Sequence, residues 1–334
     1  LSLANSVQNA DERQALISST DEETSQMLAA ESNVAASEVS SNAKTATPAQ
    51  IDHDAIAPNP PDLITHVVNN YDLETIFSYI NPQMLYVRHL GFKGRFAEAL
   101  EAGDPSAEDL RNSVRKVEDL ILEHPDITAN AIFKFFPCSS SGQELLILNS
   151  DNKTVAETFH FGRQSQRDGL CLSDYVRPSS SEKVDYIAMF TTTIGPGIRT
   201  LAEQWMKDGN YLNAHILQAL ALESAEGFAE LLHQQIRQMW GFGDPAGTSY
   251  QDLFRTQYRG RRYSFGYPAC PRLEDQEKLF NLLDVTSKIG VELTEGYMMD
   301  PEGSVSALVF HHRDAKYFNL SEADINQLEA DGLG

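Results

Sequence analysis

The chain has 334 residues, a formal net charge of -22 at pH 7 and a hydrophobic fraction of 41%. This is enough material for two domains, or for one domain with extensions, and the acidic balance disfavours nucleic acid as a general partner. No run of about 18 apolar residues occurs, so the sequence predicts no membrane-spanning helix and no membrane partner.

The first 60 residues differ in composition from the rest. They contain no aromatic side chain, and nine acidic residues against two basic ones. Residues 11–28 have side chains at helical spacing and predict one modest helix. Residues 29–61 are rich in Ser, Ala and Asn and end in a proline cluster, which is typical of a flexible linker. We therefore expect the folded part to begin at residue 62.

Helices are predicted first in the folded part. Residues 71–77 and 84–87 are typical of short helices on either side of Asn81-Pro82. Ser106-x-x-Asp109 has the pattern of a capping box. It would begin a longer helix with one apolar face, formed by Leu110, Val114, Val117 and Ile121.

Three strands should follow that helix. Residues 131–136 and 145–148 are rich in β-branched, aromatic and aliphatic side chains, and the segment 137–142 between them runs from a proline to a glycine. This pattern predicts two strands joined by a turn. Residues 154–161 alternate weakly and predict a third strand.

An apolar, β-rich run over residues 183–193 predicts a central strand. It leads into Gly195-Pro196-Gly197 and then a helix. A dinucleotide-binding loop would need a third glycine and a following strand with an acidic residue about 20 positions on. The sequence has neither, so we interpret the glycine pair as a strand-to-helix turn.

The longest predicted helix spans residues 213–239. Glu226 lies on its polar face, near Glu230 and His233, and periodicity alone indicates a solvated carboxylate at Glu226. The opposite face carries a mostly apolar stripe formed by Leu217, Leu220, Ser224, Phe228, Leu231, Gln235 and Met239.

Residues 255–271 combine arginines with aromatic residues, glycines and prolines. Pro268 and Pro271 exclude a helix interior and a central strand, and Gly260 and Gly266 can adopt positive φ, so we predict an ordered, irregular, extended segment. Its guanidinium groups match a carboxylate or phosphate, and its aromatic faces suit a ring or a cation. A proline-rich surface turn with solvated arginines is the alternative. The side chains concerned are Arg255, Arg259, Arg261, Arg262, Tyr263, Phe265 and Tyr267.

The remaining residues predict a helix over 274–288, closed by Gly290, and two strands over 291–297 and 304–311 joined by a turn. His311 and His312 are adjacent, so in a strand they would point to opposite faces. They are a poor metal pair, and we expect a structural or surface role. Residues 321–334 form a polar tail or terminal helix.

Together these elements predict an α+β fold. We expect a single mixed domain over 62–320, with a central antiparallel-rich sheet and long flanking helices, preceded by the linker. The three cysteines lie far apart without a Cys-x-x-Cys pair, which argues against a zinc site or a disulfide framework. That usage fits a reducing cytoplasm. The start at Leu1 suits a fragment or a processed form, and no secretory leader is recognisable.

Arg262-x-x-x-Gly266-Tyr267-Pro268-Ala269-Cys270-Pro271 resembles the signature of the C-terminal activation domain of cobalamin-dependent methionine synthase. Further segments resemble the same domain in the same order: Phe136-Pro137, 171–176, 222–230 and 314–318. The resemblance covers roughly residues 62–320. Residues 1–28 resemble, more weakly, the terminal helix that follows the cobalamin-binding module in that family.

The resemblance implies a binding site for S-adenosylmethionine. Arg262 should bind the ligand carboxylate, the backbone at Ser264 should meet the adenine or ribose end, and Glu226 should face the positive end. The implied site consists of Asn81, Glu226, Arg262, Ser264, Tyr267, Tyr317 and Phe318. Asn81 is a departure, because the family has an aspartate there that bonds the ligand amine. Either that bond is weakened or Asp72 substitutes for it.

The function implied is reactivation. In the family, this domain presents S-adenosylmethionine to inactive cob(II)alamin, an electron comes from flavodoxin or an equivalent reductase, and methyl transfer restores methylcobalamin for methionine biosynthesis. No side chain need act as a general base or nucleophile. The cobalamin motif Asp-x-His-x-x-Gly is absent, so cobalamin should be held by a module outside this chain. The alternatives are a ligand-binding or flavodoxin-docking module without its own chemistry, and a reactivator of a separate corrinoid protein.

Overall fold

The computed structural model describes residues 51–52, 58–166, 168–195 and 197–331. The helix predicted at 11–28 and most of the predicted linker lie outside these residues. The described end of the linker contacts the domain. The Pro58 carbonyl accepts a hydrogen bond from Trp240 Nε1 at 2.9 Å, and Arg313 Nη2 lies 2.9 Å from Asp52 Oδ2.

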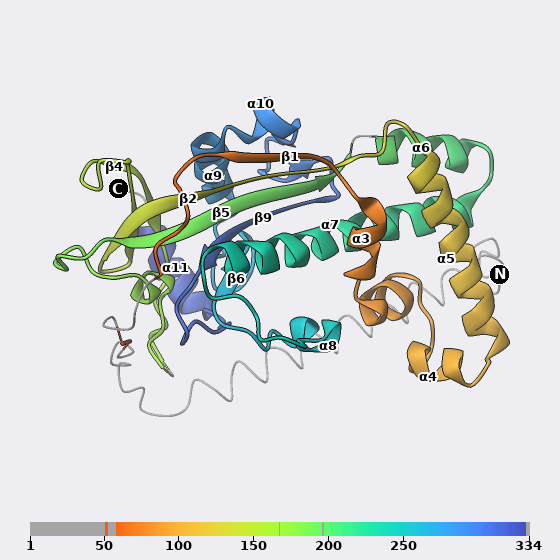
Figure 1. Ribbon diagram of the computed structural model, residues 1–334, viewed down its shortest axis with the longest axis horizontal. Coiled ribbons are helices and arrows are strands. Elements are labelled where there is room, and N and C mark those ends of the chain that lie inside the picture. The colour runs from red at the N-terminus through yellow and green to blue at the C-terminus, as the bar shows by residue number, and fades with distance from the viewer. Residues whose placement is uncertain (1–50, 53–57, 167, 196, 332–334) are drawn as a thin grey trace, which may run out of the picture. The chain divides into compact units, whose positions relative to one another are not determined.

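A seven-stranded sheet lies at the centre of the fold, with strand order β4-β3-β2-β5-β9-β6 and β1 paired to β2 (Figure 1). All of its strand pairs are antiparallel, which confirms the predicted mixed fold with an antiparallel-rich sheet. The strands are β1 (His66–Tyr71), β2 (Ala129–Ser141), β3 (Glu144–Leu148), β4 (Val155–His160), β5 (Asp185–Ile194), β6 (Arg261–Tyr263) and β9 (Ser304–Phe310).

Two apolar clusters cover the two faces of this sheet. Alternate residues of β5 supply both, because successive side chains of a strand point to opposite faces. Ala188 and Phe190 pack with α7 (Tyr211–Met239), whereas Ile187 and Met189 pack with α9 (Gln276–Leu283) and α10 (Val285–Ile289). Figure 1 shows α7 along one face of the sheet and α9 and α10 on the other.

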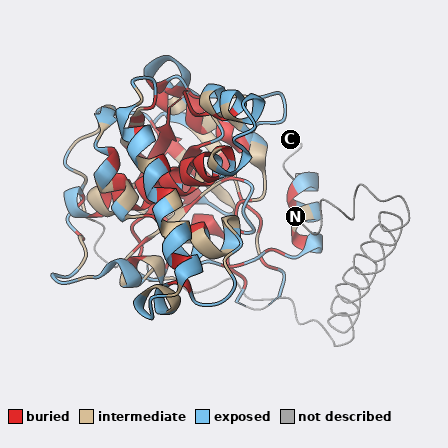
Figure 2. Ribbon diagram, turned by 90° about the vertical axis from the view of Figure 1, so that its right-hand side faces the viewer, coloured by how far each residue is buried: buried red, intermediate tan, exposed pale blue. Residues whose placement is uncertain are grey.

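Of the remaining helices, α3, α5 and α6 pack against α7 in the same apolar cluster. Figure 2 shows buried residues gathered in the interior and exposed residues on the outside. Within the described part of the chain, no helix is both long and apolar enough to cross a membrane. The remaining helices are α3 (Leu73–Ser78), η1 (Gln83–His89), α4 (Phe96–Glu101), α5 (Pro105–Glu123), α6 (Gly197–Lys207), α8 (Tyr250–Phe254) and α11 (Glu322–Asp331), with short 3-10 turns at η2 (Leu172–Tyr175) and η3 (Leu273–Asp275).

The structure corrects four local predictions. The strand predicted to end at residue 136 continues through Pro137 to Ser141. Pro137 pairs with β5 on one side, and on its other side β1 has already ended and β3 has not begun, so no partner needs its missing N–H. The long helix begins at Pro105 and is capped by Asp104 rather than by Ser106, because the Asp104 carboxylate accepts from the Ala107 N–H at 3.0 Å.

The other two corrections concern the C-terminal half. The predicted helix over 274–288 is divided at Asp284, which adopts a left-handed conformation with φ 59°. Residues 291–297 do not pair with β9. A separate two-stranded sheet forms instead between β7 (Glu292–Leu293) and β8 (Met299–Asp300).

The predicted longest helix is confirmed as α7, which has 29 residues. It is more buried than the predicted single stripe, since Glu230 and His233 on the supposed polar face are also buried.

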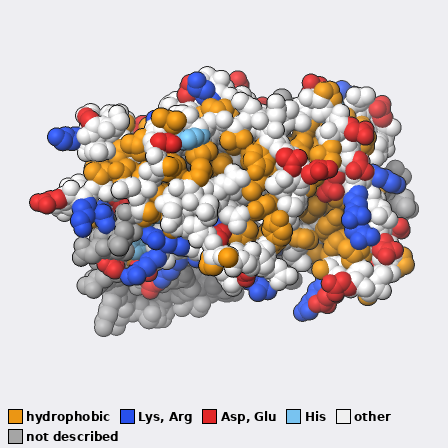
Figure 3. Space-filling view, in the orientation of Figure 1, with side chains coloured by type: hydrophobic (Ala, Val, Ile, Leu, Met, Phe, Trp, Pro, Cys, Tyr) orange, Lys and Arg blue, Asp and Glu red, His pale blue; other side chains and the backbone are white. Residues whose placement is uncertain are grey.

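Figure 3 shows large apolar areas on one face of the molecule, with acidic and basic side chains interspersed rather than gathered into one field.

Candidate ligand-binding site

Two adjoining cavities contain all seven residues predicted to form the site. The α7 cavity, of about 460 Å³, is lined by residues of α7, η1, β6 and β9 and includes Asn81. The β6 cavity, of about 280 Å³, lies beside the Gly-Tyr-Pro-Ala-Cys segment and includes Ser264 and Phe318. The residues that line both cavities are Glu226, Arg262, Tyr267 and Tyr317.

Three glutamates of α7 line the α7 cavity in a row. Glu223, Glu226 and Glu230 are separated by three and four residues, so they lie on one helix face. They differ in exposure: Glu226 has a side chain that is 47% exposed, whereas Glu223 and Glu230 are buried. The carboxylate predicted to be solvated on periodicity alone therefore lies in the wall of a cavity.

The arginine-rich segment is partly a strand, which corrects the prediction of a wholly irregular loop. Arg261–Tyr263 form the edge strand β6, in which Arg262 is paired with Val309 of β9. Gly260 precedes it with φ 78°, and a Cβ at that position would lie 2.5 Å from the Phe310 carbonyl oxygen. Only glycine fits this close approach, and the turn it makes directs the Arg262 side chain toward α7.

Arg262 forms ion pairs with two of the α7 glutamates. Its Nη1 donates a hydrogen bond to Glu230 Oε2, and its Nη2 lies 3.7 Å from Glu226 Oε2. The Arg262 side chain is 16% exposed. Burial opposes its charge, but the carboxylates of Glu230 and Glu226 outweigh burial and raise the pKa of Arg262. The guanidinium is thus permanently charged, with its Nη2 edge toward the cavities.

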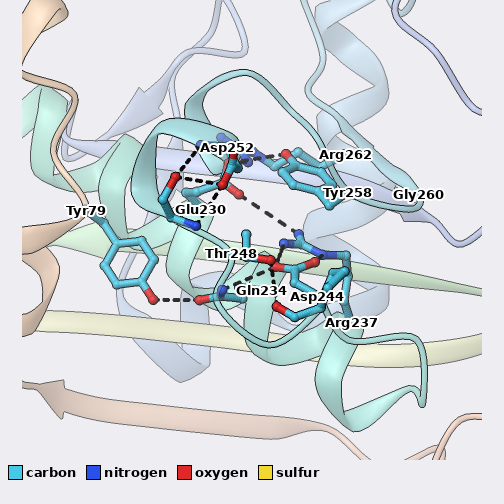
Figure 4. Close-up of polar contacts among 12 residues, drawn as sticks. Tyr79, Glu230, Gln234, Arg237, Asp244, Thr248, Asp252, Tyr258, Gly260 and Arg262 are labelled. Carbon is cyan, nitrogen blue, oxygen red and sulfur yellow. Dashed lines mark hydrogen bonds and ion pairs between the residues drawn. The ribbon is translucent and has the colours of Figure 1, made fainter.

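A buried polar network supports this arrangement from behind (Figure 4). Tyr258 donates to Glu230 Oε2 at 3.3 Å, and its ring lies 3.8 Å from the Arg237 guanidinium. Arg237 in turn binds Asp244 through Nε at 2.9 Å and Nη2 at 2.6 Å. Sequence reasoning missed Arg237, Asp244 and Tyr258, because nothing in the spacing of these residues links them to Glu230 before the chain folds.

His233 lies within the same network and is fully buried. Neither ring nitrogen has a hydrogen-bond partner among the described residues, and its ring meets that of Tyr258 edge to face at 5.2 Å. Burial lowers the pKa of His233 well below its ordinary value, and the neighbouring Arg237, Arg262 and Arg261 lower it further. His233 is therefore a neutral packing residue here.

Two tyrosines form the exposed part of the shared wall. Tyr267 is 59% exposed and Tyr317 is 51% exposed, and Tyr317 meets the Tyr263 ring edge to face at 5.4 Å. The Glu226 carboxylate, and then burial, raise the pKa of the Tyr267 phenol, whereas burial is the main cause that raises the pKa of Tyr317. Both phenols stay neutral at physiological pH, so the wall offers ring faces and neutral hydroxyls.

Two other arginines of the segment bind backbone carbonyls. Arg261 donates from Nη1 to the carbonyls of Tyr258 and Gly260, both at 2.6 Å, and Arg259 Nε donates to the His311 carbonyl at 3.0 Å. Arg259 and Arg261 therefore do not join Arg262 in binding one anion. Arg262 is the only Lys or Arg that lines either cavity among the described residues.

Asn81 and Asp72 have different surroundings. Asn81 lines the α7 cavity, but its side-chain oxygen accepts the Gln83 N–H at 3.0 Å. Asp72 caps α3 by accepting from the Thr75 N–H at 2.9 Å, and it lines neither cavity. The suggestion that Asp72 replaces the missing aspartate is therefore not supported by its position.

The predicted structural role of the adjacent histidines agrees with their contacts. His311 and His312 are buried, and His311 Nε2 lies 2.7 Å from Asp185 Oδ1. No group of three His, Cys, Asp or Glu side chains suited to a metal ion occurs in the described part of the chain. The three cysteines are free and buried.

The site is thus one of recognition. It places one fixed cation opposite several carboxylates, beside exposed tyrosine rings and the backbone of an ordered turn. That combination suits a zwitterion that carries further positive charge and a flat ring system.

Comparison with known families gives one family match over most of the chain. The family described as vitamin B12 dependent methionine synthase, activation domain, matches residues 72–331. The chain is 30% identical over 290 residues to a methionine synthase of Mycobacterium tuberculosis (strain ATCC 25618 / H37Rv), and 27% identical over 287 residues to one of Mycobacterium leprae (strain TN). Each alignment covers 80% of this chain but only 24% and 23% of those proteins, so the chain spans about a quarter of their length.

A solved structure is also similar. It is described as the MetH reactivation domain bound to AdoHcy, and it matches with a TM-score of 0.78 and 26% identity, over 86% of this chain and 94% of that one. The similarity extends over nearly the whole of that domain.

Proposed function

Because the chain belongs to the activation-domain family of vitamin B12 dependent methionine synthase, we propose that it binds S-adenosylmethionine across the α7 and β6 cavities. The observation that carries this proposal is the position of Arg262 in the wall that both cavities share, opposite the α7 glutamates. The solved relative described as bound to AdoHcy supports a ligand of this class.

Each polar group of the site then has a role. The Nη2 edge of Arg262 binds the ligand carboxylate, because Nη1 donates to Glu230 whereas Nη2 is 3.7 Å from Glu226. Glu226 lies on the shared wall, where it faces the sulfonium. Tyr267 and Tyr317 flank the ligand, and the β6 cavity receives the adenosine part against the Ser264 backbone and the Phe318 ring.

The reaction served by this binding is reductive methylation. One electron from a reductase and the methyl group of S-adenosylmethionine together convert cob(II)alamin into methylcobalamin and leave S-adenosylhomocysteine. The residues of this chain bind the ligand and fix the direction of its methyl group, which lowers the barrier through positioning. In this proposal the chain is the activation module of a cobalamin-dependent methyltransferase of methionine biosynthesis.

Two partners follow from that role. The first is a cobalamin-binding module of the same enzyme, and the second is flavodoxin or an equivalent reductase, in the cytoplasm. A module that binds the ligand or flavodoxin without its own chemistry, or one that reactivates a separate corrinoid protein, would use the same cavities. Reconstitution with the cobalamin module of the same enzyme distinguishes these alternatives, because only the activation module of that enzyme would restore methylcobalamin there.

Calorimetric titration of this chain with S-adenosylmethionine and S-adenosylhomocysteine tests the proposal. We expect saturable binding of one molecule of either ligand per chain. Binding of neither ligand to a folded chain would overturn the proposed function.

A further inference from the structure

Glu223 and His89 form a polar pair in the α7 cavity that the roles above leave unused. His89 Nε2, from η1, lies 2.9 Å from Glu223 Oε1, from α7. The Glu223 side chain is only 7% exposed, and its hydrogen bond among the described residues uses Oε1 alone. The His89 backbone carbonyl lies 3.0 Å from His215 Nε2, which anchors the turn that carries His89.

The other carboxylates of this cavity either already pair with a guanidinium or are exposed to solvent. Glu230 accepts bonds from Arg262 and Tyr258 on Oε2, and its Oε1 lies 4.0 Å from Arg237 Nη1, so its charge is already matched by two guanidinium groups. Glu226 is half exposed and lies 3.7 Å from Arg262 Nη2, and Glu302 is exposed in the turn before β9. Glu223 is therefore the buried carboxylate of the cavity that is not paired with a guanidinium.

The amino-acid end of the ligand limits where its ammonium can lie. Carboxylate and ammonium share one carbon, so the group that binds the ammonium must lie close to Arg262. Glu223 is one helical turn from Glu226, which itself contacts Arg262. Both glutamates line the α7 cavity together with Tyr267, whose pKa they both raise.

We propose that Glu223, oriented by His89, is the carboxylate that binds the ligand ammonium. This inference rests on the proposed function and assigns the amine contact that Asn81 does not supply. Asn81 has no charge, and its oxygen is bonded to the Gln83 N–H. His89 is a positioning residue, because it fixes Oε1 and leaves Oε2 for the ligand.

The electrostatic environment of Glu223 agrees with this role. Burial raises the pKa of Glu223, His89 opposes that shift, and Glu226 adds to it. A carboxylate destabilised by burial and by a like charge gains most from a cation placed beside it. Glu230, Arg262 and Glu302 are the remaining charged groups of the cavity lining.

Four ligands separate the contacts by calorimetry. S-adenosylmethionine and S-adenosylhomocysteine carry both ammonium and carboxylate, decarboxylated S-adenosylmethionine carries the ammonium alone, and 5′-methylthioadenosine carries neither. Glu223→Gln should weaken the binding of the three ligands that carry an ammonium by about 10- to 100-fold, as expected for loss of one charge-assisted bond. The same substitution should leave the affinity for 5′-methylthioadenosine unchanged. Glu226→Gln should instead lower the preference for the sulfonium ligand over S-adenosylhomocysteine.

Two further variants make the test specific. His89→Phe should weaken the binding of the three ligands that carry an ammonium. His89→Gln keeps a hydrogen-bond donor and should retain most of the wild-type affinity. Glu118→Gln is the control, since burial also raises the pKa of Glu118 but it lies on α5 outside both cavities.

The outcomes are distinguishable from failure of the proposed function. If the wild-type chain binds none of the four ligands, the proposed function fails. If the wild-type chain binds them, two results would overturn the inference. In the first, Glu223→Gln and His89→Phe both bind S-adenosylmethionine as tightly as wild type. In the second, both variants lose as much affinity for 5′-methylthioadenosine as for S-adenosylmethionine.

Discussion

Arg262 shows how a binding residue is coupled to the core. Its guanidinium neutralises the buried Glu230 while its other edge faces the cavities. Removing one partner of a buried pair costs about 3–5 kcal/mol, because the other charge stays buried. Arg262→Ala should therefore lower the free energy of unfolding by about that amount, in denaturant titration. If Arg262 lay on a loop, as its sequence context suggests, this substitution would leave the fold intact.

His233 should make the stability of the domain depend on pH. The native histidine stays neutral, while in the unfolded chain it binds a proton below about pH 6.5. Because the unfolded state then binds more protons, stability falls as pH falls. Between pH 6.5 and 5 the wild type should lose about 1–2 kcal/mol more than His233→Leu. Parallel urea titrations of the two proteins check this, and equal pH slopes would show that His233 is protonated in the native state.

At the scale of elements, local patterns predicted what local physics determines. The apolar run over residues 183–193 predicted β5, the helical periodicity predicted α7, and the left-handed Gly290 ends α10 as expected. The errors have tertiary causes. Pro137 is tolerated because neighbouring strands end beside it, and Arg261–Tyr263 became a strand because β9 offered an edge. Neither cause is visible in a single segment.

The start of α5 provides a local test. Asp104→Ala removes the side-chain acceptor of the Ala107 N–H and should lower the free energy of unfolding by about 1 kcal/mol. Ser106→Ala is the matched control, and it should cost only a few tenths of that amount because Ser106 caps nothing. A larger loss for Ser106→Ala than for Asp104→Ala, measured by thermal melts, would restore the capping box suggested by the sequence.

On the scale of the whole molecule, the site exists only after folding. Its seven predicted residues come from the turn before η1, from α7, from β6 and the turn after it, and from the segment after β9. Their identities could be predicted because each segment resembles a segment of the activation-domain family. The supporting network of Arg237, Asp244 and Tyr258 could not, since it depends on how α7 meets the segment before β6.

The residue at which the folded part begins can be tested by proteolysis. Composition predicts a protease-accessible linker over 29–61, but Asp52 and Pro58 contact the domain. Limited proteolysis should therefore cut within residues 29–51 and leave a resistant core that begins near residue 52. Resistance throughout residues 29–51, at protease levels that cut an unfolded control, would contradict the linker.

The binding of S-adenosylmethionine by the Arg262 edge is tested most directly by Arg262→Lys, in calorimetric titrations beside the wild type. Lysine keeps the charge that Glu230 requires but cannot form a planar fork with a carboxylate. We predict about tenfold weaker binding of S-adenosylmethionine and unchanged binding of decarboxylated S-adenosylmethionine, with thermal melts confirming that the variant is folded. Wild-type affinity for S-adenosylmethionine in folded Arg262→Lys, or equal losses for both ligands, would contradict the placement of the ligand carboxylate at Arg262.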